Sequence, residues 1–322
     1  MENIVDKIII KSPEDAIRAY DDGRRSVALC VPPYGDRQVN EVINTVYYEK
    51  DYYVPYHYAD RGAETLLILK GRVEATLYGK ACECGEGDFI NIPSHCPYSL
   101  RTLEDGCVIR GIYTDRDMSS RYRDLELLGA GALACRSEPG YIADVFDPAH
   151  NLHALAEPVD TIKVEKDSLP QITPAGRAIY EYGGWEGISC QLKVGRWNLK
   201  RVKEIWQFTI AGGYQLQYFE PDKNERLYCV QCGTVRIEAF GGAVFAVKND
   251  LIRIPQYTPF TLTAMAGKTE VLDLNVSARL FRMLEMLQLA QRDEPEKTAD
   301  PEWLKWLLEM NGSNLTGFVY AE

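Results

Sequence analysis

Apolar and polar residues alternate along this chain in short runs, and turn residues separate these runs about every eight to twelve positions. Alternation of this kind predicts β-strands, and the spacing is typical of an antiparallel sandwich or barrel. The clearest predicted strands are 65–69, 73–78, 89–92 and 108–113 in the first half of the chain, and 227–231, 235–240, 251–254 and 269–276 in the second. The chain is therefore predicted to be all-β.

Helical signals occur only at the margins of these strands. Ser12 and Pro13 supply an N-cap and a first helical position, and Gly23 follows as a stop signal. Leucines recur at about helical spacing over 277–292, and Asp300 with Pro301 opens a second short helix. We expect these helices to pack on a barrel face or on a second subunit.

The two sets of strands belong to an internal repeat. Residues 70–100 align with residues 232–262 without a gap, at a constant offset of 162, and ten of the 31 positions are identical. The identical residues include Gly71 with Gly233 and Pro93 with Pro255, which restrict backbone geometry at turns and strand ends. A repeat of this size indicates duplication of a whole folding unit.

The length of 322 residues also suggests two domains. We assign 1–24 to an N-terminal helical extension, 25–115 to a first barrel and 116–184 to an inter-domain connection. A second barrel then spans 185–277, and residues 278–322 form C-terminal helices.

The net charge of −11 changes the set of expected partners, because nucleic acid and anionic membrane surfaces attract basic proteins. We therefore expect neither partner. No apolar run is long enough for a signal peptide or a spanning helix, so a cytoplasmic location is expected. The nine cysteines are an odd number in a chain without export signals, which favours reduced thiols.

Two motifs in the first unit carry candidate chemistry. The first reads HYADRGAE from His57 to Glu64, with Gly71 seven residues later, and the second reads GDFINIPSHCPY from Gly87 to Tyr98. This pattern resembles the two motifs of the cupin superfamily. The resemblance covers about residues 45–114, recurs more weakly in about 205–276, and implies two jelly-roll barrels, a bicupin.

The resemblance implies four metal-ligand positions in each barrel. In the first barrel His57 and Glu64 match two of them, whereas Ala59 and Tyr98 replace the two other histidines. The family's glycine positions before the first histidine and after the proline are occupied by Asp51 and His95. The corresponding ligand positions of the second barrel hold Phe219, Pro221, Arg226 and Phe260, so no metal is expected there.

A divalent metal such as Fe, Mn, Ni or Zn would find His57, Glu64, His95 and Tyr98 as candidate ligands in the first barrel. Tyr98 and Glu64 are the candidate catalytic residues, with Tyr98 able to act as a general acid or base. The alternative is structural, because a buried histidine and glutamate can simply bond to each other and to Tyr98.

Tyrosines are concentrated in the first unit, with several arginines near them. A barrel lined by phenols and a few convergent polar groups suits a planar or hydroxylated organic ligand. We therefore select Tyr56, Arg61 and Arg110 as candidate substrate-binding residues. Tyrosine also favours strands for conformational reasons, and half of these side chains must then face outward.

Three functional interpretations follow. The chain is either a bicupin that binds a small molecule in its N-terminal barrel, with a metal-dependent activity that resembles quercetinase-type dioxygenases, or a metal-free small-molecule-binding bicupin. The third interpretation is structural, with barrels that serve dimerisation. A homodimer is expected in each case.

Overall fold

The computed structural model describes residues 8–31, 41–60, 62–114, 152–155, 170–195, 204–218, 226–239, 241–255, 258–276, 280–310 and 315–320. The chain divides into two compact units. One comprises residues 15–177 and 196–202 and is called the N-terminal barrel below. The other comprises residues 1–14, 178–195 and 203–322 and is called the C-terminal barrel.

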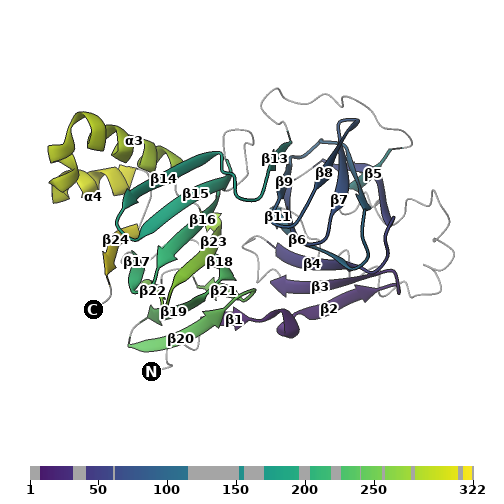
Figure 1. The fold of residues 1–322 in the computed structure, drawn as a ribbon, viewed down its shortest axis with the longest axis horizontal. Helices are drawn as coiled ribbons and strands as arrows, with labels where there is room; N and C mark the ends of the chain where they lie inside the picture. Colours follow the sequence, from purple (N-terminus) through teal and green to yellow (C-terminus); the bar gives the residue numbers. More distant parts are fainter. Residues whose placement is uncertain are drawn as a thin grey trace. The chain divides into compact units, whose positions relative to one another are not determined.

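The N-terminal barrel is made of two antiparallel sheets (Figure 1). Its seven-stranded sheet has the order β13-β9-β6-β11-β4-β3-β2, and its five-stranded sheet has the order β12-β5-β10-β7-β8. The strands are β2 (Ile17–Asp21), β3 (Arg25–Val31), β4 (Glu41–Tyr47), β5 (Tyr53–Ala59), β6 (Ala63–Lys70), β7 (Val73–Leu77), β8 (Lys80–Cys84), β9 (Phe89–Ile92), β10 (Tyr98–Thr102), β11 (Cys107–Thr114), β12 (Leu152–Ala154) and β13 (Gln171–Thr173).

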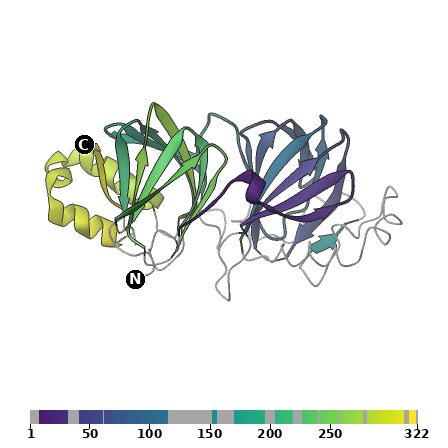
Figure 2. The same cartoon turned by 90° about the horizontal axis from the view of Figure 1, so that it is seen from below.

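The C-terminal barrel, which Figure 2 draws from below, repeats this topology. Its sheets have the orders β1-β21-β18-β23-β16-β15-β14 and β20-β19-β22-β17-β24. The strands are β1 (Ile9–Lys11), β14 (Tyr180–Trp185), β15 (Ile188–Val194), β16 (Glu204–Ala211), β17 (Tyr214–Tyr218), β18 (Arg226–Cys232), β19 (Thr234–Ala239), β20 (Gly242–Val247), β21 (Leu251–Ile254), β22 (Phe260–Ala264), β23 (Lys268–Val276) and β24 (Leu315–Tyr320).

Strand register confirms the repeat. Glu64 pairs with Ile92 between β6 and β9, and Arg226 pairs with Ile254 at the corresponding place between β18 and β21. The correspondence also extends beyond the segment that the sequence comparison identified. Ile10 of β1 pairs with Ile252, as Ile172 of β13 pairs with Ile90. Ile252 lies 162 residues after Ile90, whereas Ile10 lies 162 residues before Ile172.

The prediction of a helix between Ser12 and Gly23 is wrong. Pro13–Asp15 form a single 3-10 turn, and the chain then continues as β2, which pairs with β3. Tyr20 is buried in this pairing. Pairing in the sheet therefore overrides the local helix signal.

The two C-terminal helices are confirmed as α3 (Leu280–Asp293) and α4 (Pro301–Met310). The buried face of α3 joins the core of the C-terminal barrel through Leu280, Met283 and Leu284. Glu204 fixes the start of this helix, because its Oε2 accepts hydrogen bonds from the Phe281 backbone N–H at 3.1 Å and from the Trp206 indole at 2.8 Å. No helix among the described residues has the length and apolar character that crossing a membrane requires.

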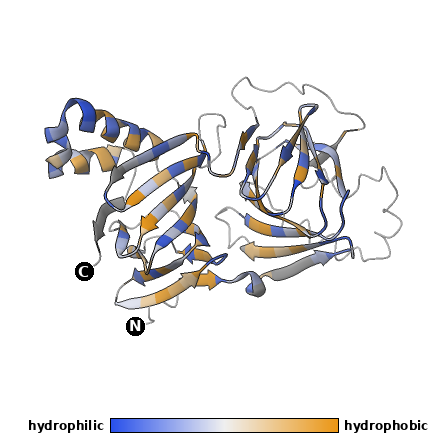
Figure 3. Ribbon diagram, viewed as in Figure 1, coloured by the Kyte–Doolittle hydropathy of each residue, from blue (hydrophilic) through white to orange (hydrophobic). Residues whose placement is uncertain are grey.

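Hydrophobic and polar residues alternate along many strands, and Figure 3 shows this alternation as orange and blue bands on the ribbon. Because successive side chains of a strand point to opposite faces, the hydrophobic residues gather on one face of the sheet. The core of the N-terminal barrel includes Leu66, Ile68, Ile90 and Ile92 from the larger sheet. It also includes Leu77, Tyr98 and Leu100 from the smaller sheet. Side chains on these faces of β6 and β10 therefore point into the barrel.

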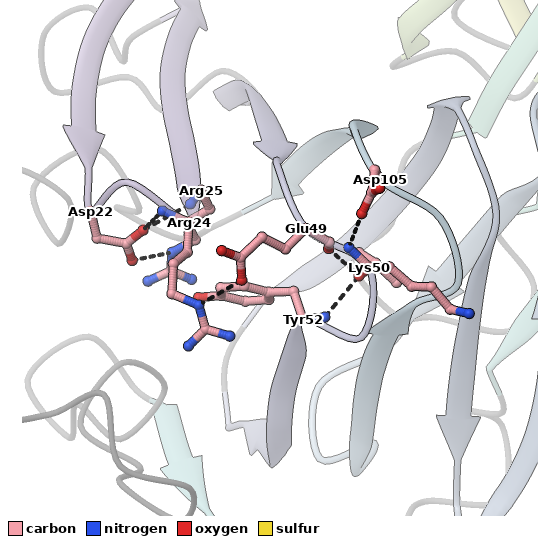
Figure 4. Close-up of polar contacts among 8 residues, drawn as sticks. Asp22, Arg24, Arg25, Glu49, Lys50, Tyr52 and Asp105 are labelled. Carbon is pink, nitrogen blue, oxygen red and sulfur yellow. Dashed lines mark hydrogen bonds and ion pairs between the residues drawn. The ribbon is translucent and has the colours of Figure 1, made fainter.

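Polar contacts join three turns at one end of the N-terminal barrel (Figure 4). Asp22 accepts backbone hydrogen bonds from Arg24 and Arg25, and Arg24 donates to Glu49 at 3.2 Å. Lys50 donates its backbone N–H to Asp105 at 2.6 Å. These contacts hold together the turns after β2, β4 and β10.

The repeated turn glycines provide a stability test. Gly71 and Gly233 have φ angles of +82° and +80°, and an added Cβ would lie 2.6 Å from Cys107 Sγ or 2.5 Å from Thr269 Oγ1. Alanine at either position is expected to cost about 2 kcal/mol of unfolding free energy, from left-handed strain plus crowding. Gly23, at φ +81° with open space around it, is the control and should show the strain alone. Urea denaturation of the three variants measures the difference, and equal losses would contradict the crowding.

Candidate functional site

Three of the predicted site residues converge in the interior of the N-terminal barrel. His57 on β5 lies directly across from Tyr98 on β10, and their ring centroids are 4.3 Å apart. The Tyr98 hydroxyl donates a hydrogen bond of 2.7 Å to Glu64 Oε2 on β6. Each of the three residues is only 4% exposed. The cluster lies toward the opposite ends of β5 and β10 from the turns drawn in Figure 4, because Tyr53 and Arg101 pair at the turn end.

The imidazole of His57 is oriented by the backbone. Its Nδ1 lies 2.7 Å from the carbonyl oxygen of Pro55. A carbonyl oxygen can only accept, so Nδ1 carries the proton in this contact. In a neutral ring with this tautomer, Nε2 is the nitrogen that accepts hydrogen bonds or binds a metal ion.

His95 does not join this cluster, which corrects the expectation that it is a fourth ligand. Its ring stacks against Tyr58 with centroids 6.1 Å apart. Tyr58 follows His57 directly in β5, and adjacent strand residues face opposite sides of a sheet. The backbone N–H of His95 donates to the Ala59 carbonyl, so its role in the described structure is to fix a turn.

Asp51 and His95 nevertheless explain two motif positions. Both residues have φ angles of +60°, in the left-handed region that favours glycine. The cupin pattern that this segment resembles has glycine at both positions. The turns of the motif are thus kept although the glycines are not, because Asp and His tolerate this conformation better than most residues.

Two of the predicted substrate-binding residues, Tyr56 and Arg110, are not brought to the cluster. The Tyr56 hydroxyl accepts a hydrogen bond of 2.9 Å from the Gly79 backbone N–H and thereby holds the turn between β7 and β8. Arg110 pairs with Leu67, three residues after Glu64, so it faces the opposite side of the sheet, where it donates to Asn44 at 2.9 Å. Arg110 is therefore corrected from a candidate ligand contact to a buried structural residue. Arg61 lies outside the described residues.

The C-terminal barrel has different residues at the same places. Phe260 occupies the position of Tyr98, and its ring packs edge-on against Tyr228 with centroids 5.9 Å apart. Arg226 occupies the position of Glu64 and forms a buried ion pair with Asp273, at 3.4 Å between Nη1 and Oδ2. Trp206 and Phe208 are completely buried in the same core. Phe219 and Pro221 lie outside the described residues.

The Arg226–Asp273 pair is the feature that the sequence reasoning missed. Arg226 was identified only as a replaced ligand, and Asp273 was passed over inside a predicted strand. A signal was present, because an acid within the apolar run VLDL of β23 must either face water or find a buried partner.

The donor set of the N-terminal cluster limits what it can bind. It offers one imidazole nitrogen, one carboxyl group and one phenol, and an oxygen of the carboxyl group already accepts the Tyr98 hydroxyl. Within the part of the chain that the structure describes, no three His, Cys, Asp or Glu side chains are grouped to hold a metal ion. These residues do not by themselves complete a metal centre with three protein ligands of these types.

Comparison with known proteins identifies the fold. No family model matches the chain, and no curated protein matches it. A deletion mutant of oxalate decarboxylase from Bacillus subtilis matches with a TM-score of 0.53 at 14% identity, covering 82% of this chain and 76% of that one. A second oxalate decarboxylase structure, which concerns the substrate binding mode and a reaction specificity switch, also matches with a TM-score of 0.53 at 14% identity. The match covers 82% of this chain and 76% of that one.

A third structure, of the Bacillus subtilis enzyme and concerned with its Mn(II) centres, matches with a TM-score of 0.50 at 13% identity over the same shares of the two chains. At these identities the likeness shows the fold. The chain accordingly has the all-β, two-barrel cupin fold, that of a bicupin.

Proposed function

We propose that the N-terminal barrel binds a small, hydroxylated organic molecule at the cluster of His57, Glu64 and Tyr98. The observation that carries this proposal is the buried hydrogen bond from Tyr98 to Glu64 beside the His57 imidazole, whose Nδ1 contacts the Pro55 carbonyl. The apolar side chains of Leu66, Ile92 and Leu77 belong to the same core. Few polar groups set among apolar walls are typical of sites for small organic ligands.

The cluster suggests how such a ligand would be recognised. One ligand hydroxyl can donate to His57 Nε2 of a neutral ring. The phenol oxygen of Tyr98 can accept a hydrogen bond from the ligand while the phenol O–H donates to Glu64. The ring of Tyr98 offers an aromatic surface for a planar ligand. In an enzyme of this kind, Tyr98 would be the general acid or base and Glu64 its proton partner.

A metal-dependent oxidoreductase of the dioxygenase type is the second candidate. The favouring observation is the contact of His57 Nδ1 with the Pro55 carbonyl, since metal-binding histidines commonly donate their other ring nitrogen in this way. Bound iron, manganese, nickel or zinc would supply Lewis-acid or redox chemistry. Because the described donors do not complete such a centre, we derive no reaction step through it.

The test is ligand binding by protein that has been stripped of metal. A panel of phenols, hydroxy acids and dicarboxylic acids is screened by thermal shift, and hits are measured by calorimetry. We expect at least one hit with about one site per chain, and a loss of affinity of tenfold or more in His57→Ala with Glu64→Gln, because each lost hydrogen bond costs about 1 kcal/mol or more. His95→Asn removes an imidazole from the other face and keeps a residue that tolerates positive φ, so it should bind like the parent protein.

Metal content separates the two candidates. Protein prepared without chelator or a metal-affinity tag is analysed for its elements before stripping. About one metal ion per chain, lost in the His57→Ala, Glu64→Gln variant together with all ligand binding, would favour the second candidate. Ligand binding that survives stripping supports the first, whereas nearly two ions per chain, or ligand binding that the double variant retains, would overturn the assignment of the N-terminal barrel.

A further inference from the structure

We propose that two copies of the chain form a dimer by antiparallel pairing of their β20 strands about Val244. β20 (Gly242–Val247) is an edge strand of the five-stranded sheet of the C-terminal barrel, and among the described strands it pairs only with β19 (Figure 1). Its sequence, GAVFAV, contains no charged residue and no proline. Main-chain groups on an edge of this kind can bond to a strand of another chain. The pairing does not depend on what the N-terminal barrel binds.

The strand register determines which main-chain groups of β20 face its outer edge, the side away from β19. Ala239 and Gly242 are partners across the turn between the two strands. Only two residues separate them, so they must exchange main-chain hydrogen bonds with each other, and from there such bonds occur at every second pair. The N–H and C=O groups of the intervening residues Ala243, Phe245 and Val247 therefore point to the outer edge.

The contacts of Val247 agree with this direction. Its N–H donates to the Asp250 carboxylate at 2.8 Å, and its carbonyl accepts from the Asp250 N–H at 3.0 Å. The turn after β20 thus closes one end of the outer edge, and Ala243 and Phe245 remain to bond to another strand. Both residues are exposed, Phe245 by 56%. A second chain can therefore reach this edge.

The repeat shows that the fold does not require an apolar edge here. β8 is the corresponding edge strand of the N-terminal barrel, and the offset of 162 places Lys80 at the position of Gly242 and Glu83 at the position of Phe245. Glu83 forms an exposed ion pair with Arg72 at 2.6 Å. Charged side chains are a common means of keeping sheet edges from pairing. β8 is therefore protected against another strand, and β20 is not.

A second copy of β20 fits the groups that the outer edge offers. When Val244 lies opposite Val244 of the second copy, Ala243 of each copy lies opposite Phe245 of the other. Both of these pairs can then exchange their main-chain hydrogen bonds, whereas moving one strand by two residues in either direction keeps only one pair between these residues. The residues brought opposite one another are uncharged, so no like charges meet.

Side chains on the outer face of the sheet add apolar contact to this pairing. Opposite residues of an antiparallel pair share a face, so Phe245 would cover Ala243 of the second copy. Val247 and Met265 are also exposed, by 52% and 43%. Thr234 joins them, because it pairs with Val247 and its carbonyl accepts the Met265 N–H. The interface thus has an apolar surface as well as main-chain bonds.

The oligomeric state of the full chain tests the proposal. Sedimentation velocity is measured over a range of concentrations. One strand per copy is a small contact, so we expect a concentration-dependent mass that approaches twice that of one chain. Ala243→Pro removes an outward N–H and leaves the pairing with β19, and Phe245→Glu supplies the residue that β8 has. Each should raise the dissociation constant of the dimer tenfold or more, since each removes contacts at two symmetric places.

A matched control and a cross-link complete the test. Ala81→Pro makes the same substitution at the corresponding place of β8 and should leave the dissociation constant unchanged. Val244→Cys, in a chain whose exposed Cys232 is replaced by serine, should form a disulfide between chains on mild oxidation. Residues at the twofold axis form a pair without mutual hydrogen bonds, with Cα atoms about 4.5 Å apart, which suits a disulfide.

Three results would overturn the proposal. The first is a mass of one chain at every concentration, which would leave the edge open to a strand of another protein. The second is a dimer that Ala243→Pro and Phe245→Glu both leave unchanged. The third is a dimer in which Val244→Cys does not cross-link before denaturation. Circular dichroism of each variant shows whether it is folded, and the exposed position of Phe245 makes Phe245→Glu the variant that least disturbs the barrel.

Discussion

Replacing Asp273 by alanine is expected to lower the unfolding free energy of the C-terminal barrel by about 3–5 kcal/mol, the usual cost of removing one partner of a buried ion pair. Arg226 and Asp273 are 3% and 1% exposed, and their charged atoms are 3.4 Å apart. The substitution leaves a guanidinium in the barrel interior without this counter-charge, and water does not replace the lost solvation. The effect should therefore exceed that of any surface substitution in the chain.

Two control variants separate the charge effect from the loss of packing. Arg226→Met with Asp273→Leu replaces both charges by apolar groups and should recover most of the lost stability. Glu238→Ala removes a partner from the exposed pair of Arg236 and Glu238, in the same unit, and should change stability by less than about 0.5 kcal/mol.

The measurement is chemical denaturation followed by tryptophan fluorescence. Trp206 is completely buried in the C-terminal barrel, and α4 carries Trp303 and Trp306, so this signal reports largely on that unit. Because the chain has two units, the two transitions have to be fitted separately. Equal losses in the single and double variants would show that Asp273 acts through packing and not through its charge.

Alternation and the internal repeat were sufficient to predict the all-β fold, since each of the eight predicted strands appears in the structure. The strands β1 and β13 were not predicted, because three residues are too few for a pattern and each depends on pairing far along the chain. The duplicated unit consequently begins earlier than the aligned motifs indicate. The helix expected after Ser12 failed for a related reason, since a capping signal carries little free energy beside a row of sheet hydrogen bonds.

The site was predictable as far as strand alternation determined it. His57, Glu64 and Tyr98 were placed together because motif positions fix which face each side chain occupies, and the structure brings them into contact. His95 and Arg110 were misjudged because nearness in sequence was taken for nearness in space. One lies in a turn with positive φ and the other faces the far side of a sheet, and neither property can be seen in spacing alone.

Tyr98→Phe is expected to lower the unfolding free energy of the N-terminal barrel by about 2–3 kcal/mol. The phenol donates to a carboxyl oxygen in the interior at 2.7 Å, and a buried acceptor that loses its donor keeps the cost of its desolvation. Phenylalanine keeps the ring that packs against His57, so the hydroxyl is the group under test. Phe260 at the equivalent place of the C-terminal barrel shows that the fold accommodates this ring.

A double-mutant cycle with Glu64→Leu measures the coupling of the two groups. Tyr98→Phe should cost less than about 1 kcal/mol in the Glu64→Leu background, because no buried carboxyl group is then left without its donor. Denaturation of the four proteins, followed by tyrosine fluorescence, gives the interaction free energy. Equal costs of Tyr98→Phe in both backgrounds would contradict a direct interaction between the two groups.

The same cycle distinguishes stability from function. An apolar pair of matched size in a barrel interior is often as stable as the polar pair that it replaces. The variant with both substitutions should therefore approach the stability of the parent protein and yet lose tenfold or more in affinity for the ligand of the N-terminal barrel. That outcome would mean that Glu64 and Tyr98 are present for binding and not for folding. A double variant that binds ligand as the parent does would instead assign the pair to the structure of the barrel, as Arg226 and Asp273 are assigned in its repeat.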